Sequence, residues 1–310
     1  MNKTKILAIV GSTASGKSAL AMALAERLDG EIISCDSMQI YRRMDIGTAK
    51  PTAAEQAAVR HHMIDVVEPT ETFTCADYVA AASRAIEDCA SRGKLPIVCG
   101  GTGLYLDALL RGGDFAEGGA DEDLRRELAA FAEREGNEAL HAELRRVDPE
   151  SADAIHPNNV KRVIRAIEIY RTTGKTKTEL DRQSLTLGDR YDATVIGLRY
   201  PDRERLYERI DRRVDVMLAE GLLEETQRLC NEGVFAANQT AAQAIGYKEL
   251  LGYLEGRESL ESATETLKMA TRRYAKRQMI WFAAKPYVQW LDTDEKTFDE
   301  IVNNAEKLFS

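Results

Sequence analysis

Several residue types and patterns are scarce in this 310-residue chain, and each scarcity argues against a class of protein. The five cysteines show no C-x-x-C spacing and the four histidines show no metal-ligand spacing, so we expect neither a zinc site nor a disulfide framework. No apolar run approaches the roughly 18 residues that a membrane span requires, so we expect a cytoplasmic protein without membrane contact. The net charge of −9 argues against a protein that coats nucleic acid indiscriminately.

The order of apolar segments predicts the fold. Up to residue 113, short apolar runs alternate with helical patterns, which is typical of a parallel sheet with helices on both faces. Residues 114–191 show almost only helical periodicity, and the glycine-rich "RGGDFAEGG" before them predicts a hinge. The run "DATVIGLRY" returns the chain to the sheet, and residues 192–310 add long helices and a last strand. The sequence therefore predicts an α/β core of the P-loop type, flanked by helices and interrupted by an inserted all-helical domain.

The strands expected in this core are four in the first part and two in the second. A helix capped by Thr74 is expected before the fourth strand. The expected strands are "KILAIVGS", "EIISCDS", "HHMIDVV", "LPIVCGGTG", "DATVIGLRY" and "YVQWLDTD".

A glycine-rich loop follows the first strand. "GSTASGKS", residues 11–18, matches the pattern G-x-x-x-x-G-K-[ST] between a strand and a helix. Its glycines let backbone amides point at an anion, Lys17 supplies a charge, and Ser18 can hold Mg²⁺. We therefore predict a phosphate-binding loop with Mg²⁺ as cofactor, formed by Gly11, Ser12, Thr13, Ala14, Ser15, Gly16, Lys17 and Ser18.

Polar residues at other strand ends are expected beside this loop. Asp36 follows the second strand, where a carboxylate could hold metal, orient a hydroxyl or act as a general base. "GGTG" at residues 100–103 brings Thr102 to the same edge as a hydroxyl donor. A kinase would show a metal-holding Asp at a strand end, for which Asp36 and Asp65 are the candidates, whereas "LPIVCGG" ends in glycines.

Two basic segments stand out in an acidic chain. Such a concentration is expected of a surface that contacts a phosphate backbone, although a solvated helix face accounts for it equally well. The basic residues are Lys161, Arg162 and Arg165 in "KRVIRAIEIYR", and Arg272, Arg273, Lys276 and Arg277 in "TRRYAKRQMIWF".

Taken together, seven segments in this order resemble the bacterial tRNA dimethylallyltransferases. The resemblance covers nearly the whole chain and is weakest at about residues 114–150 and 180–192 and in the last helix. The segments are "GSTASGKS", "DSMQIYRRMDIGTAKPT", "HHMIDVVEPTETFTCADY", "GGTGLYLDALLRG", "HPNNVKRVIRAIEIYRTTGKT", "QAIGYKEL" and "TRRYAKRQMIWF".

The resemblance implies a reaction. In that family the glycine-rich loop holds the diphosphate of dimethylallyl diphosphate, and the dimethylallyl group moves to the exocyclic amine of the adenosine 3′ of the anticodon. Asp36 matches the general base, and we expect Thr102 and Arg213 to be catalytic as well, with Arg213 preferred over Arg209 one turn away. The implied partners are tRNA, through its anticodon stem-loop, and dimethylallyl diphosphate, and we expect a monomer.

The resemblance also implies where tRNA binds. The reacting adenine must be flipped out of the loop at a cost of a few kcal/mol, which the helical insertion and the basic segments would offset. The implied tRNA-binding residues are Asp36, Ser37, Met38, Gln39, Lys161, Arg162, Val163, Ile164, Arg165, Gln243, Gly246, Tyr247, Lys248, Arg272, Arg273, Tyr274, Lys276, Arg277 and Gln278.

Three alternatives stay open at this point. A nucleotide or metabolite kinase would use the same loop with ATP and transfer its γ-phosphate. A non-catalytic RNA-binding module would bind RNA without needing Asp36 or Lys17. An adenylate isopentenyltransferase would prenylate free nucleotide and would not need the helical insertion.

Overall fold

The computed structural model describes residues 3–111, 121–183 and 190–309. The chain forms two compact units, one of residues 1–110 and 189–310 and the other of residues 111–188. The insertion expected at 114–191 thus differs by three residues at each end from the second unit. Residues 112–119, most of the expected hinge, lie outside the described part.

The first unit is built on a parallel sheet of six strands in the order β3-β2-β4-β1-β5-β6. This arrangement confirms the expected fold class. Because β1 lies between β4 and β5, the glycine-rich loop that follows it starts near the middle of the sheet edge. The strands are β1 (Thr4–Gly11), β2 (Gly30–Ser34), β3 (His61–His62), β4 (Leu95–Cys99), β5 (Tyr191–Arg199) and β6 (Val288–Asp292).

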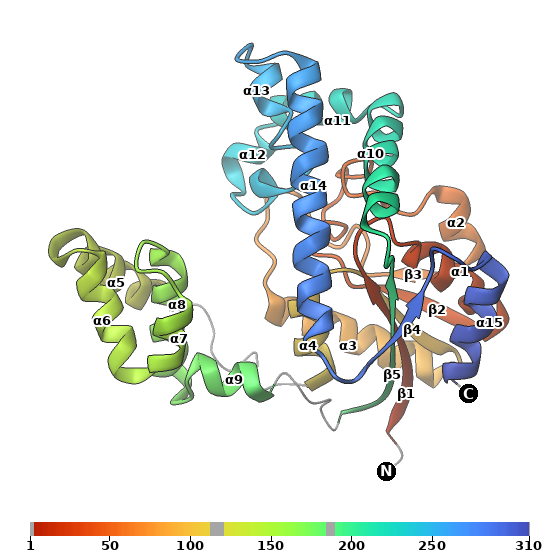
Figure 1. Cartoon of the computed structure of the whole chain (residues 1–310), viewed down its shortest axis with the longest axis horizontal. Coiled ribbons are helices and arrows are strands. Elements are labelled where there is room, and N and C mark those ends of the chain that lie inside the picture. The colour runs from red at the N-terminus through yellow and green to blue at the C-terminus, as the bar shows by residue number, and fades with distance from the viewer. Residues whose placement is uncertain (1–2, 112–120, 184–189, 310) are drawn as a thin grey trace. The chain divides into compact units, whose positions relative to one another are not determined.

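Helices cover both faces of this sheet because the central strand is apolar on both sides. Leu7 and Ile9 of β1 pack in one buried cluster with Leu20 and Leu24 of α1 (Lys17–Arg27), each such side chain contributing about 2 kcal/mol. The closing helix α15 (Phe298–Phe309) lies beside α1 on this face (Figure 1). Helices α3 (Cys75–Ser91) and α14 (Leu260–Ala283) contact strands of the sheet from the other side (Figure 1).

Local signals account for where α3 begins, and backbone turns account for the short third strand. The side chain of Thr74 accepts the amide of Asp77 in a capping box, which confirms the expected helix start. The strand expected over "HHMIDVV" is wrong in length, because only His61 and His62 pair with β2. Met63 and Asp65 have φ of 64° and 55°, and this left-handed backbone ends the pairing.

A second apolar core in the same unit involves the loop after β2 and the helices after β5. Tyr41, Met44, Leu222, Tyr247 and Leu267 are all buried in it. The long helices α10 and α14 pack against each other (Figure 1). The remaining helices of this unit are α2 (Ala53–Ala58), α4 (Gly103–Arg111), α10 (Arg203–Ala219), α11 (Leu222–Asn231), α12 (Val234–Ala237), α13 (Leu251–Leu254) and the 3₁₀ turn η2 (Ala241–Gln243).

The second unit has a core of its own, and its described residues contain only helices and connecting turns. Leu140, Leu144 and Val163 are fully buried there. The buried carboxylate of Glu168 is ion-paired with Arg125 and Arg165, which offsets the cost of burying it. The helices are α5 (Glu122–Glu135), α6 (Asn137–Val147), α7 (Pro149–Ala154), α8 (Val160–Thr173) and α9 (Lys177–Gln183).

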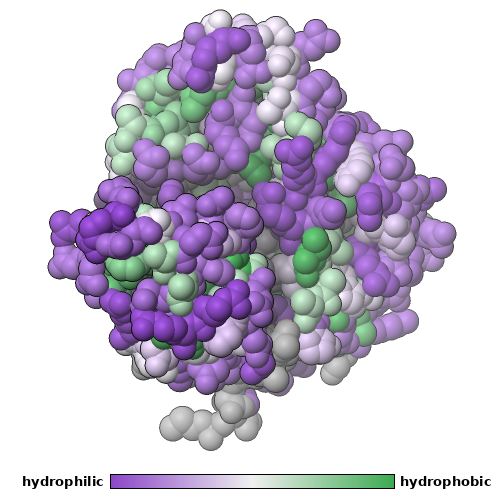
Figure 2. All heavy atoms as spheres, turned by 60° about the vertical axis from the view of Figure 1, so that its left-hand side comes forward, coloured by the Kyte–Doolittle hydropathy of each residue, from purple (hydrophilic) through white to green (hydrophobic). Residues whose placement is uncertain are grey.

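The face of the protein shown in Figure 2 is mostly polar. Among the described residues, no helix has both the length and the apolar character to cross a bilayer. Hydrophilic side chains cover most of the face in Figure 2, and hydrophobic ones form small groups. Among the exposed large hydrophobic side chains are Leu104, Ile280 and Trp281, at 44%, 61% and 41% exposure.

The turn after β4 gives a prediction of stability. A Cβ on Gly100 would lie 2.1 Å from the backbone oxygen of Cys35. That oxygen accepts the amide of Thr102, and the amide of Cys35 donates to the carbonyl of Cys99, so the segment cannot move away without losing hydrogen bonds. We expect Gly100→Ala to lower the free energy of unfolding by about 3 kcal/mol. Gly93→Ala, at a left-handed position with open space around it, should lose only about 1 kcal/mol. Urea unfolding measures both, and equal losses would contradict the steric argument.

Candidate active site

The glycine-rich loop has the geometry of an anion site. Gly11 and Gly16 have φ of 138° and 95°, which glycine adopts without a steric cost. Lys17 opens α1, and its Nζ donates to the carbonyl of Ser12 at 2.6 Å. No side chain caps the amides at the start of α1, so they remain available for a negatively charged ligand.

Two side chains from distant helices hold this loop. Gln278 of α14 is buried, and its Oε1 accepts the amide of Thr13 at 2.8 Å. Its Nε2 donates to the carbonyl of Gly101 at 3.1 Å, so one amide ties α14 to both glycine-rich turns. From α10, Nε of Arg209 donates to the carbonyl of Ala14 at 3.0 Å.

Asp36 lies two residues beyond the end of β2, beside the glycine-rich loop. Its Oδ1 accepts the amides of Met38 at 2.8 Å and Gln39 at 3.4 Å, and among the described residues no donor is bound to Oδ2. Burial raises the pKa of Asp36, while these hydrogen bonds and the charges of Lys17 and Arg213 act in the opposite direction. A carboxylate with a raised pKa is a better base than an exposed one.

Charged groups with perturbed pKa values face one another here. Burial lowers the pKa of Lys17 to about 8; Cys99 and Asp36 partly offset this shift and Arg213 adds to it. Burial also lowers the pKa of Arg213, which Asp36 partly restores. Two desolvated cations beside one carboxylate leave an excess of positive charge that favours an anionic ligand.

A cavity of about 320 Å³ collects most of the predicted residues of the first unit. Its lining also includes apolar side chains, among them Val214, Met217, Ile245 and Leu267. The sequence-predicted residues that line it are Thr13, Lys17, Ser18, Asp36, Ser37, Met38, Gln39, Arg213, Gln243, Gly246, Lys248, Tyr274, Arg277 and Gln278.

Other predicted residues have different surroundings. Thr102 is not part of that lining, and its Oγ1 accepts the amide of Ser37 at 3.1 Å, so it positions the segment after Asp36. Tyr247 is fully buried and donates to Glu225 at 2.7 Å. Val163 and Ile164 lie in the core of the helical unit, so the side chains of Tyr247, Val163 and Ile164 are packing residues.

Each of the two basic segments contains both exposed residues and a residue held in an ion pair. Arg272 forms an ion pair with Asp211 of α10, with 2.9 Å between Nε and Oδ1, so an acid does neutralise one member of the second segment. Arg273, Lys276 and Arg277 are exposed on α14. In the helical unit, Lys161 and Arg162 are exposed and Arg165 pairs with buried Glu168.

The loop of residues 45–50 forms one wall of the cavity, and sequence reasoning did not predict the side chains that hold this loop in place. Buried Glu225 of α11 accepts the amides of Asp45, Ile46 and Gly47 at 3.0–3.1 Å. Gln39 Nε2 donates to the carbonyls of residues 48 and 49, both at 3.1 Å. The only sequence signal was Gly47, where a Cβ would lie 2.4 Å from the ring of Tyr247.

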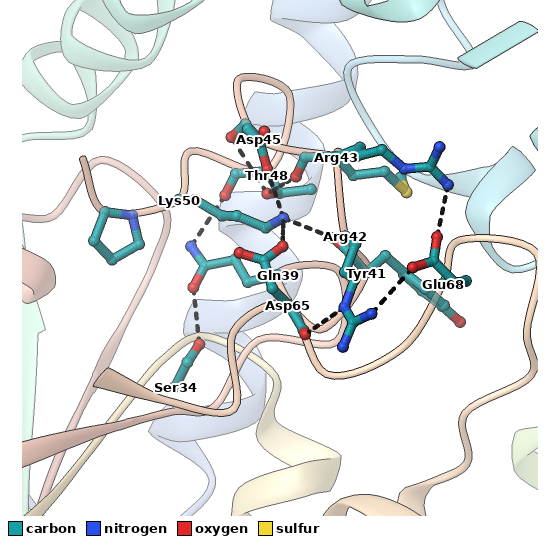
Figure 3. Close-up of polar contacts among 12 residues, drawn as sticks. Ser34, Gln39, Tyr41, Arg42, Arg43, Asp45, Thr48, Lys50, Asp65 and Glu68 are labelled. Carbon is teal, nitrogen blue, oxygen red and sulfur yellow. Dashed lines mark hydrogen bonds and ion pairs between the residues drawn. The ribbon is translucent and has the colours of Figure 1, made fainter. Parts of the chain in front are cut away.

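The far end of the 45–50 loop is fixed by a buried lysine. Figure 3 shows Lys50 between Asp45 and Asp65, whose carboxylates it contacts at 2.7 Å and 2.6 Å. Its Nζ also donates to the carbonyl of Tyr41 at 2.6 Å. Asp65, a sequence candidate for a metal ligand, is therefore ion-paired with Lys50.

The sequence of this chain is similar to those of known proteins. The sequence model of the IPP transferase family matches residues 39–285. A protein of Halalkalibacterium halodurans named tRNA dimethylallyltransferase is 49% identical over 298 residues, which cover 96% of this chain and 94% of that protein. This chain belongs to the IPP transferase family. The resemblance inferred from the seven segments is thereby confirmed.

Solved structures of IPP transferases share the fold. The full-length tRNA isopentenylpyrophosphate transferase of Bacillus halodurans matches with a TM-score of 0.72 and 46% identity, covering 99% of this chain and 97% of that one. A eukaryotic dimethylallyltransferase acting on tRNA matches with a TM-score of 0.79 and 32% identity, covering 98% of this chain and 77% of that one. The similarity therefore spans both units of this chain.

The lowered pKa of Lys17 gives a prediction of proton uptake. Burial lowers the pKa of Lys17 to about 8, so part of the Lys17 population is uncharged at pH 8. Bound diphosphate would raise that pKa by adding negative charge, so binding of an unreactive alkyl diphosphate at pH 8 should be accompanied by proton uptake of less than one proton per site. The ligand itself stays ionised at this pH, since its last pKa is about 6. Calorimetric titrations in two buffers of different ionisation enthalpy measure the uptake.

The control variant for this experiment keeps the positive charge at position 17 but has no group there that titrates near pH 8. Lys17→Arg should bind the same ligand without proton uptake, because an arginine does not titrate near pH 8. Proton release by the wild type, or the same uptake in Lys17→Arg, would contradict the assignment.

Proposed function

We propose that this chain transfers the dimethylallyl group of dimethylallyl diphosphate to the exocyclic amine of the adenosine 3′ of the anticodon of a tRNA, and releases diphosphate. The observation that carries the proposal is the 320 Å³ cavity, which unites Lys17, Arg213 and Asp36 in a member of the IPP transferase family. The relatives named above as tRNA dimethylallyltransferases support the choice of acceptor.

The donor's diphosphate would lie on the glycine-rich loop. Lys17, the first amides of α1 and Arg213 would neutralise the charge that develops as it leaves. The hydroxyls of Ser12 and Ser15 are buried without a hydrogen-bond partner among the described residues, which suits a loop built for a polar ligand. Ser18 lines the cavity with a hydroxyl that fits Mg²⁺, an ion that would neutralise phosphate oxygens when bound.

Asp36 would act as the general base. The bond between C1 of the dimethylallyl group and the diphosphate oxygen breaks as a bond from the adenine amine to C1 forms. The amine proton passes to Asp36, and the electron pair of the broken bond leaves with diphosphate. An aromatic amine is a weak nucleophile, so removing its proton as the new bond forms lowers the barrier.

The tRNA would contact the exposed basic residues of both units. Arg273, Lys276 and Arg277 lie on α14, which also lines the cavity, and the helical unit contributes Lys161 and Arg162. An adenylate isopentenyltransferase would need neither group of residues.

The experiment that tests the proposal is incubation with labelled dimethylallyl diphosphate and, in parallel, anticodon stem-loop RNA, AMP or ATP. Label in RNA alone supports the proposal; label in AMP, or γ-phosphate transfer from ATP, contradicts it.

Replacing the base gives a rate prediction. Asp36→Asn keeps the side chain's size and should lower the single-turnover rate by about 10²–10⁴-fold, because a positioned base contributes that much. The wild-type rate should fall as pH decreases through the raised pKa of Asp36, because protonation removes the base. This acidic limb should be absent in Asp36→Asn. Asp299→Asn, at an exposed position in α15, is the matched control, and a near-normal rate for Asp36→Asn would refute the role.

Replacing exposed arginines gives a salt prediction. Each phosphate contact with single-stranded RNA contributes about −0.7 to the slope of log affinity against log salt. Arg273 and Arg277 together should therefore account for about 1.4, and changing both to Gln should make the slope shallower by that amount. Lys296 and Lys307 are exposed near the carboxyl terminus, and changing both to Gln removes the same charge as a control. An unchanged slope in the arginine variant would remove these residues from the interface.

A further inference from the structure

One exposed aromatic side chain continues the cationic face of α14. Arg273, Arg277 and Trp281 are spaced four residues apart, so they follow one face of the helix, each about 6 Å further along it. Arg277 lines the cavity, and Trp281 is one turn beyond it. Trp281 is 41% exposed, although large aromatic side chains are usually well buried.

The ring of Trp281 is held firmly in this position. A Cβ on Gly103 would come within 2.2 Å of its Cδ1, so the ring lies against the start of α4. Nζ of Lys285 lies 5.4 Å from the ring centroid and is itself ion-paired with buried Asp107 at 2.8 Å. Leu104, which follows Gly103, is 44% exposed and extends the apolar surface. The ring is therefore a fixed, partly open surface next to the cavity.

We propose that Trp281 is a stacking platform for an unpaired RNA base that neighbours the reacting adenosine. The proposal rests on the proposed function and adds a subsite to it. Arg277 and Arg273 on the same face complement the phosphates of a strand that leaves the cavity along α14. A protein partner would need a larger apolar surface than one ring and its neighbours provide, whereas a single base covers such a ring.

The test compares three variants in binding to anticodon stem-loop RNA. Trp281→Ala should weaken binding about tenfold or more, because one base stacked on one aromatic ring contributes that much. Trp281→Phe should restore most of the affinity, since it keeps an aromatic face. Phe298→Ala, which removes an aromatic side chain 47% exposed at the start of α15, should change nothing. Equal unfolding midpoints would show that Trp281→Ala is folded.

Two further measurements distinguish the loss of stacking from the loss of a charge contact and from a disrupted structure. The salt slope and the KM for dimethylallyl diphosphate should be unchanged in Trp281→Ala, because no charge and no donor contact is removed. In a Trp290→Phe background Trp281 is the remaining tryptophan, and its fluorescence should be quenched by the RNA but not by a stem without its loop.

The outcomes distinguish this inference from the function on which it rests. If the wild type fails to bind the RNA, the proposed function fails. If the wild type binds and Trp281→Ala binds equally well, or fluorescence does not change, only the stacking platform is refuted. A wild-type dimer that dissociates in Trp281→Ala would assign the surface to a second copy of the chain and also overturn the proposal.

Discussion

Gln278 joins three elements through one buried amide group, accepting from Thr13 in the glycine-rich loop and donating to Gly101 after β4. Leaving either of these buried groups unpaired would cost about 1–3 kcal/mol, so α14 is held in one position against the sheet edge. The same contact explains why position 101 is a glycine, because a Cβ there would lie 2.0 Å from the Gln278 amide nitrogen. Because α14 also carries Arg277, the glycine-rich loop and the basic face of α14 are parts of one arrangement held through Gln278.

The charges in the cavity depend on that arrangement. Burial disfavours the charged forms of Lys17, Asp36 and Arg213 alike, and the attraction of each cation to Asp36 offsets only part of this cost. Removing Asp36 would leave two desolvated cations facing each other, whereas an anionic ligand would stabilise both. The diphosphate of the proposed donor would therefore complete the electrostatic balance of this site.

Local patterns were enough to predict the glycine-rich loop, the position of Asp36 and most strands. Each depends on residues close together in the chain, such as the spacing of Gly11, Gly16 and Lys17. The length of β3 was mispredicted, because the left-handed backbone at Met63 and Asp65 has no glycine to signal it. The resemblance also failed to distinguish surface residues from core residues within one segment. In "QAIGYKEL", Tyr247 is buried and the next residue, Lys248, is exposed.

The wall made by residues 45–50 could not be predicted, because the charged residues that hold it look like surface residues in the sequence. Glu225 occupies an ordinary position in an amphipathic helix, and only the fold brings its carboxylate to three backbone amides 178–180 residues away. Lys50 is likewise buried only because Asp45 and Asp65 converge on it. Glu225 and Gln39 bind backbone atoms of this loop, and Lys50 of the loop itself binds Asp65 and the carbonyl of Tyr41, so distant and local side chains together fix its path. Thr48 lines the cavity and also holds the loop, because its Oγ1 donates to the carbonyl of Met44 at 2.6 Å, whereas the side chain of Ala49 can affect the shape of the cavity without a hydrogen bond to the loop.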